Sequence, residues 1–187
     1  MKKVIILYGT RYGSTEEVSI KIGETLKELG IKIIVCNLKD IINNKGFNID
    51  DYDGIILGTG IKIGQWTKVA KSFLKIYSEK LKLLKKSLGI FIICGEASDS
   101  SKIPELKKKY VENILVKYSL NAQLYDVFGG VIDLSEDSKM GKISKKMIKM
   151  ASKEDPTIKL EQKNDFRDWN QIKAFADNYL KILQALD

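Results

Sequence analysis

Val4-Ile5-Ile6-Leu7-Tyr8 runs directly into Gly9-Thr10-Arg11-Tyr12-Gly13-Ser14-Thr15, and residues 16–22 then show the apolar spacing of a helix. A buried strand therefore passes through a loop rich in glycine and hydroxyl side chains before the helix begins. The first amides of a helix lack intrahelical partners, and the helix dipole adds partial positive charge at that end. The hydroxyl groups of the loop add further donors. This pattern predicts an anion cradle with a phosphate as its ligand.

The loop differs from two familiar phosphate-binding motifs. It has neither the Gly-x-Gly-x-x-Gly of a dinucleotide fold nor the Gly-Lys-Ser/Thr of a nucleotide triphosphatase. A single phosphate held by amides and hydroxyls, without a lysine or a magnesium ligand, favours a mononucleotide. An ordinary strand–helix turn capped by Ser14 or Thr15 is the alternative that the loop alone leaves open.

Composition sets the outer bounds. A chain of 187 residues is expected to form a single domain over residues 1–187, and it has no apolar run long enough for a transmembrane helix. The first residues lack a signal-peptide pattern, and Cys36 and Cys94 lie in apolar runs, so reduced thiols and a cytoplasmic location are expected. The sequence contains no histidine, which excludes His-dependent triads and His-ligated metals, and no metal site is expected. Any chemistry is therefore expected to come from a cofactor.

Strand and helix patterns alternate along the rest of the chain. Further strands are expected at residues 31–36, 52–58, 88–94 and 122–132, and the helices between them include 67–86 and 104–118. The strand at 88–94 is almost continuously apolar, as in strands covered on both faces. The alternation predicts an α/β fold, a doubly wound parallel sheet with helices on both faces.

Three loops are expected at one edge of this sheet, because all strand-to-helix turns of a doubly wound sheet leave at its carboxyl edge. They are residues 10–15, 58–66 and 94–101. The second loop holds three glycines, which allow backbone to approach a flat ring, and Trp66, which either stacks on that ring or anchors its helix. A planar ring that carries one phosphate between these loops is FMN, the predicted cofactor.

These residues carry a family resemblance. Thr10-Arg11-Tyr12-Gly13-Ser14-Thr15 resembles the flavodoxin phosphate loop Thr/Ser-x-Thr-Gly-x-Thr, with Tyr12 in place of the middle threonine. Gly58-Thr59-Gly60-Ile61-Lys62-Ile63-Gly64 and Asp168-Trp169-Asn170-Gln171-Ile172 are similar to segments of the menaquinone-dependent protoporphyrinogen IX dehydrogenase branch. The resemblance implies a flavodoxin-like five-stranded sheet in the order 2-1-3-4-5. Locally, Asp168 with Gln171 forms a plausible capping box for the last helix.

The resemblance also implies roles for individual residues. Backbone and hydroxyl groups of the first loop would hold the FMN phosphate, the second loop would border the isoalloxazine, and the third would line its other side. The implied cofactor-binding residues are Thr10, Arg11, Tyr12, Gly13, Ser14, Thr15, Thr59, Gly60, Ile61, Lys62, Trp66, Cys94, Gly95, Glu96 and Ala97. No catalytic acid or base is identified, because FMN itself performs the redox chemistry.

Several of these residues have a structural alternative. Cys94 either touches the flavin or is a small buried packing residue, and the packing role is favoured. Arg11 either reaches the phosphate or stays solvated, and Trp169 is expected in the core rather than at a ligand. The third loop lacks the aromatic residue that many flavodoxins carry there, so one ring face would be open to a substrate or covered by Phe128-Gly129-Gly130.

An extra segment, residues 133–164, precedes the last helix and exceeds what a minimal flavodoxin needs. Its basic stretch, residues 142–150, has Ile143, Met147 and Met150 on one helical stripe. This helix is expected either to pack near the fifth strand with a solvated lysine face or to form a platform for a substrate or partner beside the flavin. Its position resembles the extra segment of the protoporphyrinogen dehydrogenase branch.

The charge of the chain bears on its partners. The formal net charge is +8, whereas electron-carrying flavodoxins are typically acidic. The resemblance and this charge favour an FMN oxidoreductase that passes electrons from a carboxylated tetrapyrrole to a quinone. The alternatives are an electron carrier with a redox partner protein and a flavin-free binding protein. Peripheral contact with an anionic membrane and a homodimer are expected, and no nucleic acid partner, because no base-stacking aromatic platform is visible.

Overall fold

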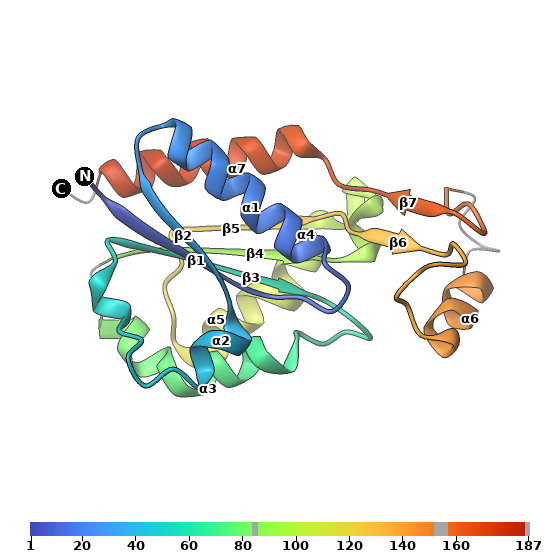
Figure 1. The fold of residues 1–187 in the computed structure, drawn as a ribbon, viewed down its shortest axis with the longest axis horizontal. Coiled ribbons are helices and arrows are strands. Elements are labelled where there is room, and N and C mark those ends of the chain that lie inside the picture. The colour runs from blue at the N-terminus through green and yellow to red at the C-terminus, as the bar shows by residue number, and fades with distance from the viewer. Residues whose placement is uncertain (84–85, 152–156, 186–187) are drawn as a thin grey trace.

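The computed structural model describes residues 1–83, 86–151 and 157–185. Its main sheet has five parallel strands in the order β2-β1-β3-β4-β5, which confirms the predicted α/β fold and strand order (Figure 1). The strands are β1 (Lys3–Gly9), β2 (Lys32–Asn37), β3 (Gly54–Gly60), β4 (Ser87–Ile93) and β5 (Leu124–Phe128).

Helices cover both faces of this sheet (Figure 1). One face carries α1 (Ser14–Glu28) and α7 (Trp169–Gln184), which pack against each other over an apolar cluster that includes Val18, Ile22 and Phe175. The opposite face carries α2 (Leu38–Ile42), α3 (Lys68–Leu83) and a helical stretch made of α4 (Ile103–Lys107), a π-helical turn (Lys108–Glu112) and α5 (Asn113–Tyr118). Short 3₁₀ turns lie at Ile49–Asp51, Gly95–Ser98 and Ser100–Lys102. The expected helix at 104–118 is thus confirmed with a π-helical turn in its middle.

The central strands β1, β3 and β4 are buried because helices cover the apolar side chains on both of their faces. Every residue of β4 is buried, as its continuous apolar run predicts. Tyr179 of α7 reaches the sheet: its hydroxyl accepts a hydrogen bond from Ser87 Oγ at 2.9 Å and lies 3.2 Å from the carbonyl oxygen of Ile55. Gly89 leaves room for this ring, because a Cβ there would lie 2.9 Å from it. One buried polar tyrosine therefore sets how α7 docks on the sheet.

The fifth strand was expected at residues 122–132, and its predicted end is wrong. The structure breaks it after Phe128, and β6 (Val131–Asp133) pairs antiparallel with β7 (Lys163–Asp165) outside the main sheet. The break is at Gly129, where a Cβ would lie 1.9 Å from the carbonyl oxygen of Phe166. Phe166 also donates its backbone amide to the carbonyl of Gly130 at 3.0 Å. The approach of these two segments turns the chain away from the sheet.

The extra segment that follows β6 contains α6 (Lys142–Ala151), which confirms the expected helix. In Figure 1, α6 lies beyond the carboxyl edge of the sheet, next to β6 and β7. The expectation that it packs near the fifth strand is therefore wrong. Lys145 tethers it to the preceding loop by donating to the carbonyl oxygen of Ser135 at 2.5 Å.

The tight contact at Gly129 predicts a strong effect of a single methyl group. Gly129→Ala is expected to lower the free energy of unfolding by about 1–3 kcal/mol, because the backbone of Phe166 cannot yield as a flexible side chain would. Gly141→Ala is the matched control, since a Cβ at Gly141 meets nothing within 4 Å, and it is expected to change stability by less than about 0.5 kcal/mol. Urea unfolding measures both, and equal stability of the two variants would refute the packing argument.

Candidate functional site

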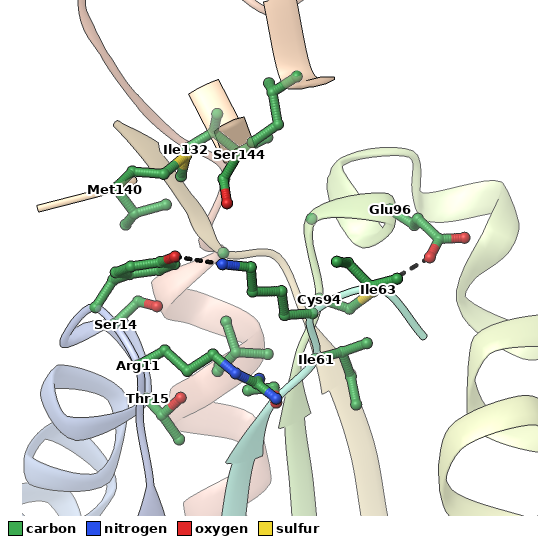
Figure 2. Close-up of a pocket in the computed structure, with 18 of the residues that line it drawn as sticks. Arg11, Ser14, Thr15, Ile61, Ile63, Cys94, Glu96, Ile132, Met140 and Ser144 are labelled. Atoms are coloured by element: carbon green, nitrogen blue, oxygen red, sulfur yellow. Dashed lines mark hydrogen bonds between the residues drawn. The ribbon is translucent and has the colours of Figure 1, made fainter. Parts of the chain in front are cut away.

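A cleft opens where β1, β3 and β4 end (Figure 2). The register of the parallel strands places the three expected loops at one level, since Gly9 pairs with Thr59 and Gly60 pairs with Ile93. The cleft measures about 310 Å³, within the range of pockets that bind small molecules. Eleven of the predicted site residues line it: Thr10, Arg11, Tyr12, Ser14, Thr15, Gly60, Ile61, Lys62, Cys94, Gly95 and Glu96.

Four predicted site residues do not line the cleft, namely Gly13, Thr59, Trp66 and Ala97. Trp66 is the main correction, because its side chain is only 3% exposed and lies in the core beside α3. Its indole nitrogen donates to the carbonyl oxygen of Tyr110 at 2.8 Å, so the ring anchors the second loop and does not stack on a ligand. Thr59 is also fully buried, and its hydroxyl lies 2.9 Å from that of Thr67.

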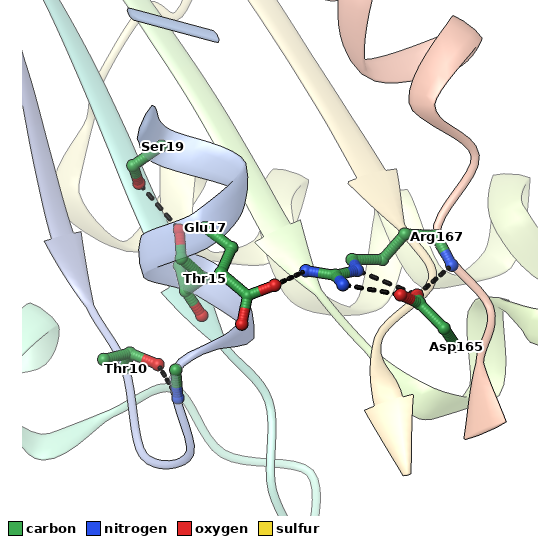
Figure 3. A network of polar contacts seen from close by, with 7 residues as sticks. Thr10, Thr15, Glu17, Ser19, Asp165 and Arg167 are labelled. Atoms are coloured by element: carbon green, nitrogen blue, oxygen red, sulfur yellow. Dashed lines mark hydrogen bonds and ion pairs between the residues drawn. The ribbon is translucent and has the colours of Figure 1, made fainter. Parts of the chain in front are cut away.

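The first loop presents free donors at the start of α1. The N-cap residue is Gly13, at φ 102°, a conformation that favours glycine, and no side chain caps the helix. The alternative of a turn capped by Ser14 or Thr15 is therefore wrong. Thr10 Oγ1 accepts the amide of Gly13 at 2.9 Å and holds the loop in shape (Figure 3). Helix amides without a side-chain cap, beside hydroxyl groups, form the expected anion cradle.

Arg11 binds the second loop. Its guanidinium donates to the carbonyl oxygens of Gly60 at 2.8 Å, Gln65 at 3.3 Å and Trp66 at 3.0 Å. Neither expectation included this contact with the second loop. The Arg11 side chain is exposed at the surface, and partial burial lowers the pKa of its guanidinium below its ordinary value. Arg11 thus fixes the second loop relative to the first.

A contact between Tyr12 and Lys62 also joins the first loop to the second. Lys62 Nζ donates to the phenolic oxygen of Tyr12 at 2.6 Å and lies 5.1 Å from the centre of its ring. Hydrogen bonding with Lys62 lowers the pKa of Tyr12 below its ordinary value, and a hydrogen bond with Ser144 of α6 acts in the same direction. Tyr12 therefore connects the first loop, the second loop and α6.

The third loop carries a protonated thiol and a carboxylate that lies near a lysine. Cys94 is buried at the end of β4, and burial raises the pKa of its thiol to about 11. Glu96 accepts a hydrogen bond from the hydroxyl of Tyr110 at 3.1 Å, and its carboxylate lies 3.9 Å from Lys109 Nζ. The favoured packing role of Cys94 agrees with this burial.

A polar network fastens the β6–β7 segment to α1 (Figure 3). Arg167 donates to Glu17 at 2.6 Å and to both carboxylate oxygens of Asp165, at 2.8 and 2.5 Å. Its guanidinium carbon lies 4.5 Å from the ring centre of Trp169, which is 40% exposed, so the expected core position of Trp169 is wrong. Asp168 caps α7 by accepting from the amides of residues 170 and 171, but the expected capping box is incomplete, because the Gln171 side chain donates to Asp126 and to the carbonyl oxygen of Val127.

Sequence reasoning anticipated the outer wall of the cleft only in part, through Gly130 and Met147. This wall is formed by Ile132, Met140, Ser144, Met147 and Ile148, together with Gly130 and Val131 (Figure 2 labels three of them). The apolar stripe of residues 142–150 was the available signal. Of its three residues, Met147 lines the cleft, whereas Ile143 and Met150 lie outside it with 80% and 63% of their surface exposed. In the described part of the chain, no group of acidic and thiol side chains could hold a metal ion.

The state of Cys94 predicts its reactivity. In a Cys36→Ser variant, which leaves Cys94 as the one thiol, alkylation of the native protein near pH 8 is expected to be at least about 100-fold slower than in denaturant, because the raised pKa leaves little thiolate. The rate should climb as the pH approaches 11. Iodoacetamide labelling followed by mass spectrometry measures both rates, and fast native labelling at neutral pH would contradict the buried, protonated thiol.

Curated relatives resemble the chain over most of its length. Protoporphyrinogen IX dehydrogenase [quinone] of Escherichia coli K12 is 25% identical over 179 residues, which cover 93% of this chain and 92% of that protein. The protein of the same name from Leishmania major is 21% identical, covering 98% of this chain and 77% of its own length. Among solved structures, oxidised flavodoxin 1 of Bacillus cereus matches with a TM-score of 0.55 and 18% identity, covering 96% of this chain and 97% of its own length.

A family model described as a flavodoxin domain matches residues 5–159. FMN is the cofactor that such a domain implies, and the cleft fits it on three observations. The start of α1 offers amides and hydroxyls to a phosphate, and apolar side chains that include Ile61, Cys94 and Ile132 line the adjoining space. In addition, Gly60 brings backbone close to the hydroxyl of Thr15, where a Cβ would lie 3.2 Å away. The chain therefore belongs to the flavodoxin domain family, and FMN is its cofactor.

Proposed function

We propose that the protein is an FMN-dependent oxidoreductase that passes electrons from a carboxylated tetrapyrrole, or a similar donor, to a quinone. The observation that carries this proposal is the outer wall of the cleft. An electron carrier needs only an exposed flavin edge, whereas this chain adds β6, β7 and α6 beyond the three loops and lines the cleft with Met140, Met147 and Ile148. An apolar wall beside a flavin suits a large flat ring system.

The residues of the chain would position and shield this chemistry. FMN supplies the electron transfer when bound, and each turnover takes two electrons and two protons from the donor and converts one quinone to its quinol. The amides at the start of α1 and the hydroxyls of Thr10, Ser14 and Thr15 would hold the phosphate. Ile61 and Cys94 would border the ring, and Met147 would keep water from its outer side.

The charge of the outer segment supports a carboxylated donor. Five lysines lie on or just before α6, at positions 139, 142, 145, 146 and 149. Propionate groups on the rim of a tetrapyrrole would meet these cations while its rings face the apolar wall. The curated relatives named protoporphyrinogen IX dehydrogenase [quinone] support the same substrate class.

A flavodoxin-type electron carrier with a redox partner protein is the second candidate. It is favoured by the nearly complete overlap with flavodoxin 1 of Bacillus cereus. The two candidates differ in whether the outer wall takes part in turnover.

The first experiment compares two substitutions on α6. In a lipid-free assay with protoporphyrinogen and a water-soluble quinone, Met147→Asp is expected to lower kcat/KM about tenfold or more, because it places a charge in the apolar wall. Ile143→Asp makes the same change one helical turn away, on a side chain that is 80% exposed and outside the cleft. Its kcat/KM should therefore stay within about twofold of that of the original protein.

FMN content and reduction by dithionite are the controls, and both variants should match the original protein. If the original protein holds FMN and accepts electrons from dithionite but does not oxidise the porphyrinogen, the carrier function replaces the enzyme function. If Met147→Asp and Ile143→Asp have equal kcat/KM, the outer wall is not the substrate platform.

Peripheral binding to an anionic membrane at the cytoplasmic face belongs to the same proposal, because a membrane quinone must reach the cleft. No helix in the described ranges has both the length and the apolar character of a membrane span. The exposed Ile143 and Met150 share α6 with several lysines, a combination typical of helices that lie on a charged lipid surface. A homodimer, and no nucleic acid partner, complete the proposed set of partners.

Vesicle co-sedimentation tests this membrane contact. Vesicles with anionic phosphatidylglycerol are expected to bind the protein more strongly than phosphatidylcholine vesicles, and Ile143→Asp should lower that binding about tenfold. Ile20→Asp is the matched control, since Ile20 lies on α1, is also exposed, and the substitution changes the charge equally. Equal loss in both variants would show a general charge effect and no specific contact through α6.

A further inference from the structure

The second loop contains a tight hairpin. Lys62 and Gln65 exchange both backbone hydrogen bonds at 3.1 Å, and the two residues between them have positive φ, 49° at Ile63 and 65° at Gly64. Positive φ at both central residues of a two-residue hairpin is typical of a type I′ turn. Such a turn favours asparagine, aspartate or glycine at its first central position, where this chain has isoleucine.

Isoleucine is unfavourable at position 63 for two separate reasons. Its branched Cβ crowds the left-handed backbone conformation, which lowers the stability of the fold. Burial of the side chain does little to offset this strain, since 76% of its surface is exposed to solvent. An asparagine would suit both the backbone and the solvent better, so neither the turn nor the core explains this residue.

The hairpin is nevertheless held firmly in this conformation. Arg11 donates to the carbonyl oxygens of Gln65 and Trp66 at 3.3 and 3.0 Å, and Lys71 Nζ donates to Gln65 Oε1 at 3.1 Å. Trp66 in turn is anchored by its bond to the carbonyl oxygen of Tyr110 at 2.8 Å. A strained backbone persists only where its surroundings over-determine it, and such positions cluster at active sites and ligand clamps.

Ile63 belongs to the rim of the cleft. It lines the cleft with most of its surface exposed, whereas Ile93 and Cys94, which line the same cleft at the end of β4, are buried. Figure 2 shows Ile63 beside Cys94, with Met140 of the outer wall on the other side of the cleft. Apolar side chains from the second loop and from the outer segment therefore flank the cleft, and a large apolar ring system would contact both.

We propose that Ile63 is a contact residue for the electron donor and contributes to its specificity, by packing against the ring system of a carboxylated tetrapyrrole at the rim of the cleft. This contact would bury the exposed side chain and so accounts for an isoleucine in a turn that favours asparagine. The inference rests on the proposed function and deepens it, because it adds the second loop to the α6 wall as a surface that binds the donor.

Anaerobic stopped-flow kinetics of the FMN-loaded protein, without lipid, tests this contact. Ile63→Asn is expected to slow reduction of the bound FMN by protoporphyrinogen about tenfold, because an apolar contact is lost. Reoxidation by a water-soluble quinone should change less than about twofold. Ile63→Leu keeps an apolar side chain and should lose less than Ile63→Asn in the donor reaction. The matched control is Ile76→Asn, on a side chain of α3 that is 56% exposed and outside the cleft, and it should change neither rate.

Thermal unfolding supplies a readout that does not depend on turnover. Ile63→Asn is expected to raise the Tm of the protein by about 2–6 °C, because asparagine tolerates the left-handed conformation better. Its dissociation constant for FMN should change less than about threefold, since Ile63 lies at the rim. A Tm that does not rise would refute the strain argument and the inference with it.

The kinetic results separate this inference from the proposed function. If Ile63→Asn reacts with the donor as fast as the original protein does, or slows only the quinone reaction, Ile63 does not bind the donor. If the substitution instead acts only by weakening the binding of FMN or of anionic vesicles, Ile63 contacts the flavin or a membrane. Each of these results overturns the inference alone. If protoporphyrinogen does not reduce the FMN of the original protein, the proposed function falls, and the inference falls with it.

Discussion

The parallel pairing of β1 with β3 is the constraint on which the site depends. Ile5 pairs with Ile55, Leu7 with Leu57 and Gly9 with Thr59, so both strands leave the sheet at the same level. Their helices then run to opposite faces, and a crevice opens between the loops. The same register continues into β4, where the amide of Ile61 binds the carbonyl oxygen of Ile93 at 2.8 Å. Loops distant in sequence thereby share one cleft, and the hydrogen bonds of Arg11 to the second loop then fix their relative position.

The start of α1 shows how binding and stability compete at this edge. A side-chain cap contributes about 0.5–2 kcal/mol to a helix, and α1 has none, because Gly13 occupies the N-cap. The helix amides therefore remain available to an anion, and an anion bound there would stabilise the folded protein in place of a side-chain cap. Thr10 and Arg11 keep the loop ordered in the meantime by bonding to backbone groups within it and in the second loop. The site is thus held in shape by groups that need not contact the phosphate.

The sequence was most informative where burial alone dictates structure. Continuous apolar runs located the four strands β1 to β4, and the glycine and hydroxyl pattern located the first loop. Long polar side chains were harder to place from the sequence. Arg11, for example, can donate to any carbonyl oxygen within reach, and only the folded chain shows that the carbonyl oxygens of the second loop are nearest. The prediction that Trp66 stacks on the flavin was wrong for a related reason. An indole beside glycines suits a ligand, but in the folded chain its N–H donates to the buried carbonyl oxygen of Tyr110. The break after Phe128 depends on a contact with Phe166, 38 positions later, which no local pattern reveals.

The outer wall is built differently from the rest of the cleft. The three loops are extensions of buried strands, whereas α6 is joined to its surroundings by polar contacts such as Lys145 to the carbonyl of Ser135 and Ser144 to Tyr12. Such a segment adds little to the core, so its residues are free to change without loss of the sheet. The division has a functional consequence. The sheet edge holds the phosphorylated flavin. Under the proposed function, the added segment would select the molecule that reaches this flavin, so the cofactor site would not need to be rebuilt for a substrate.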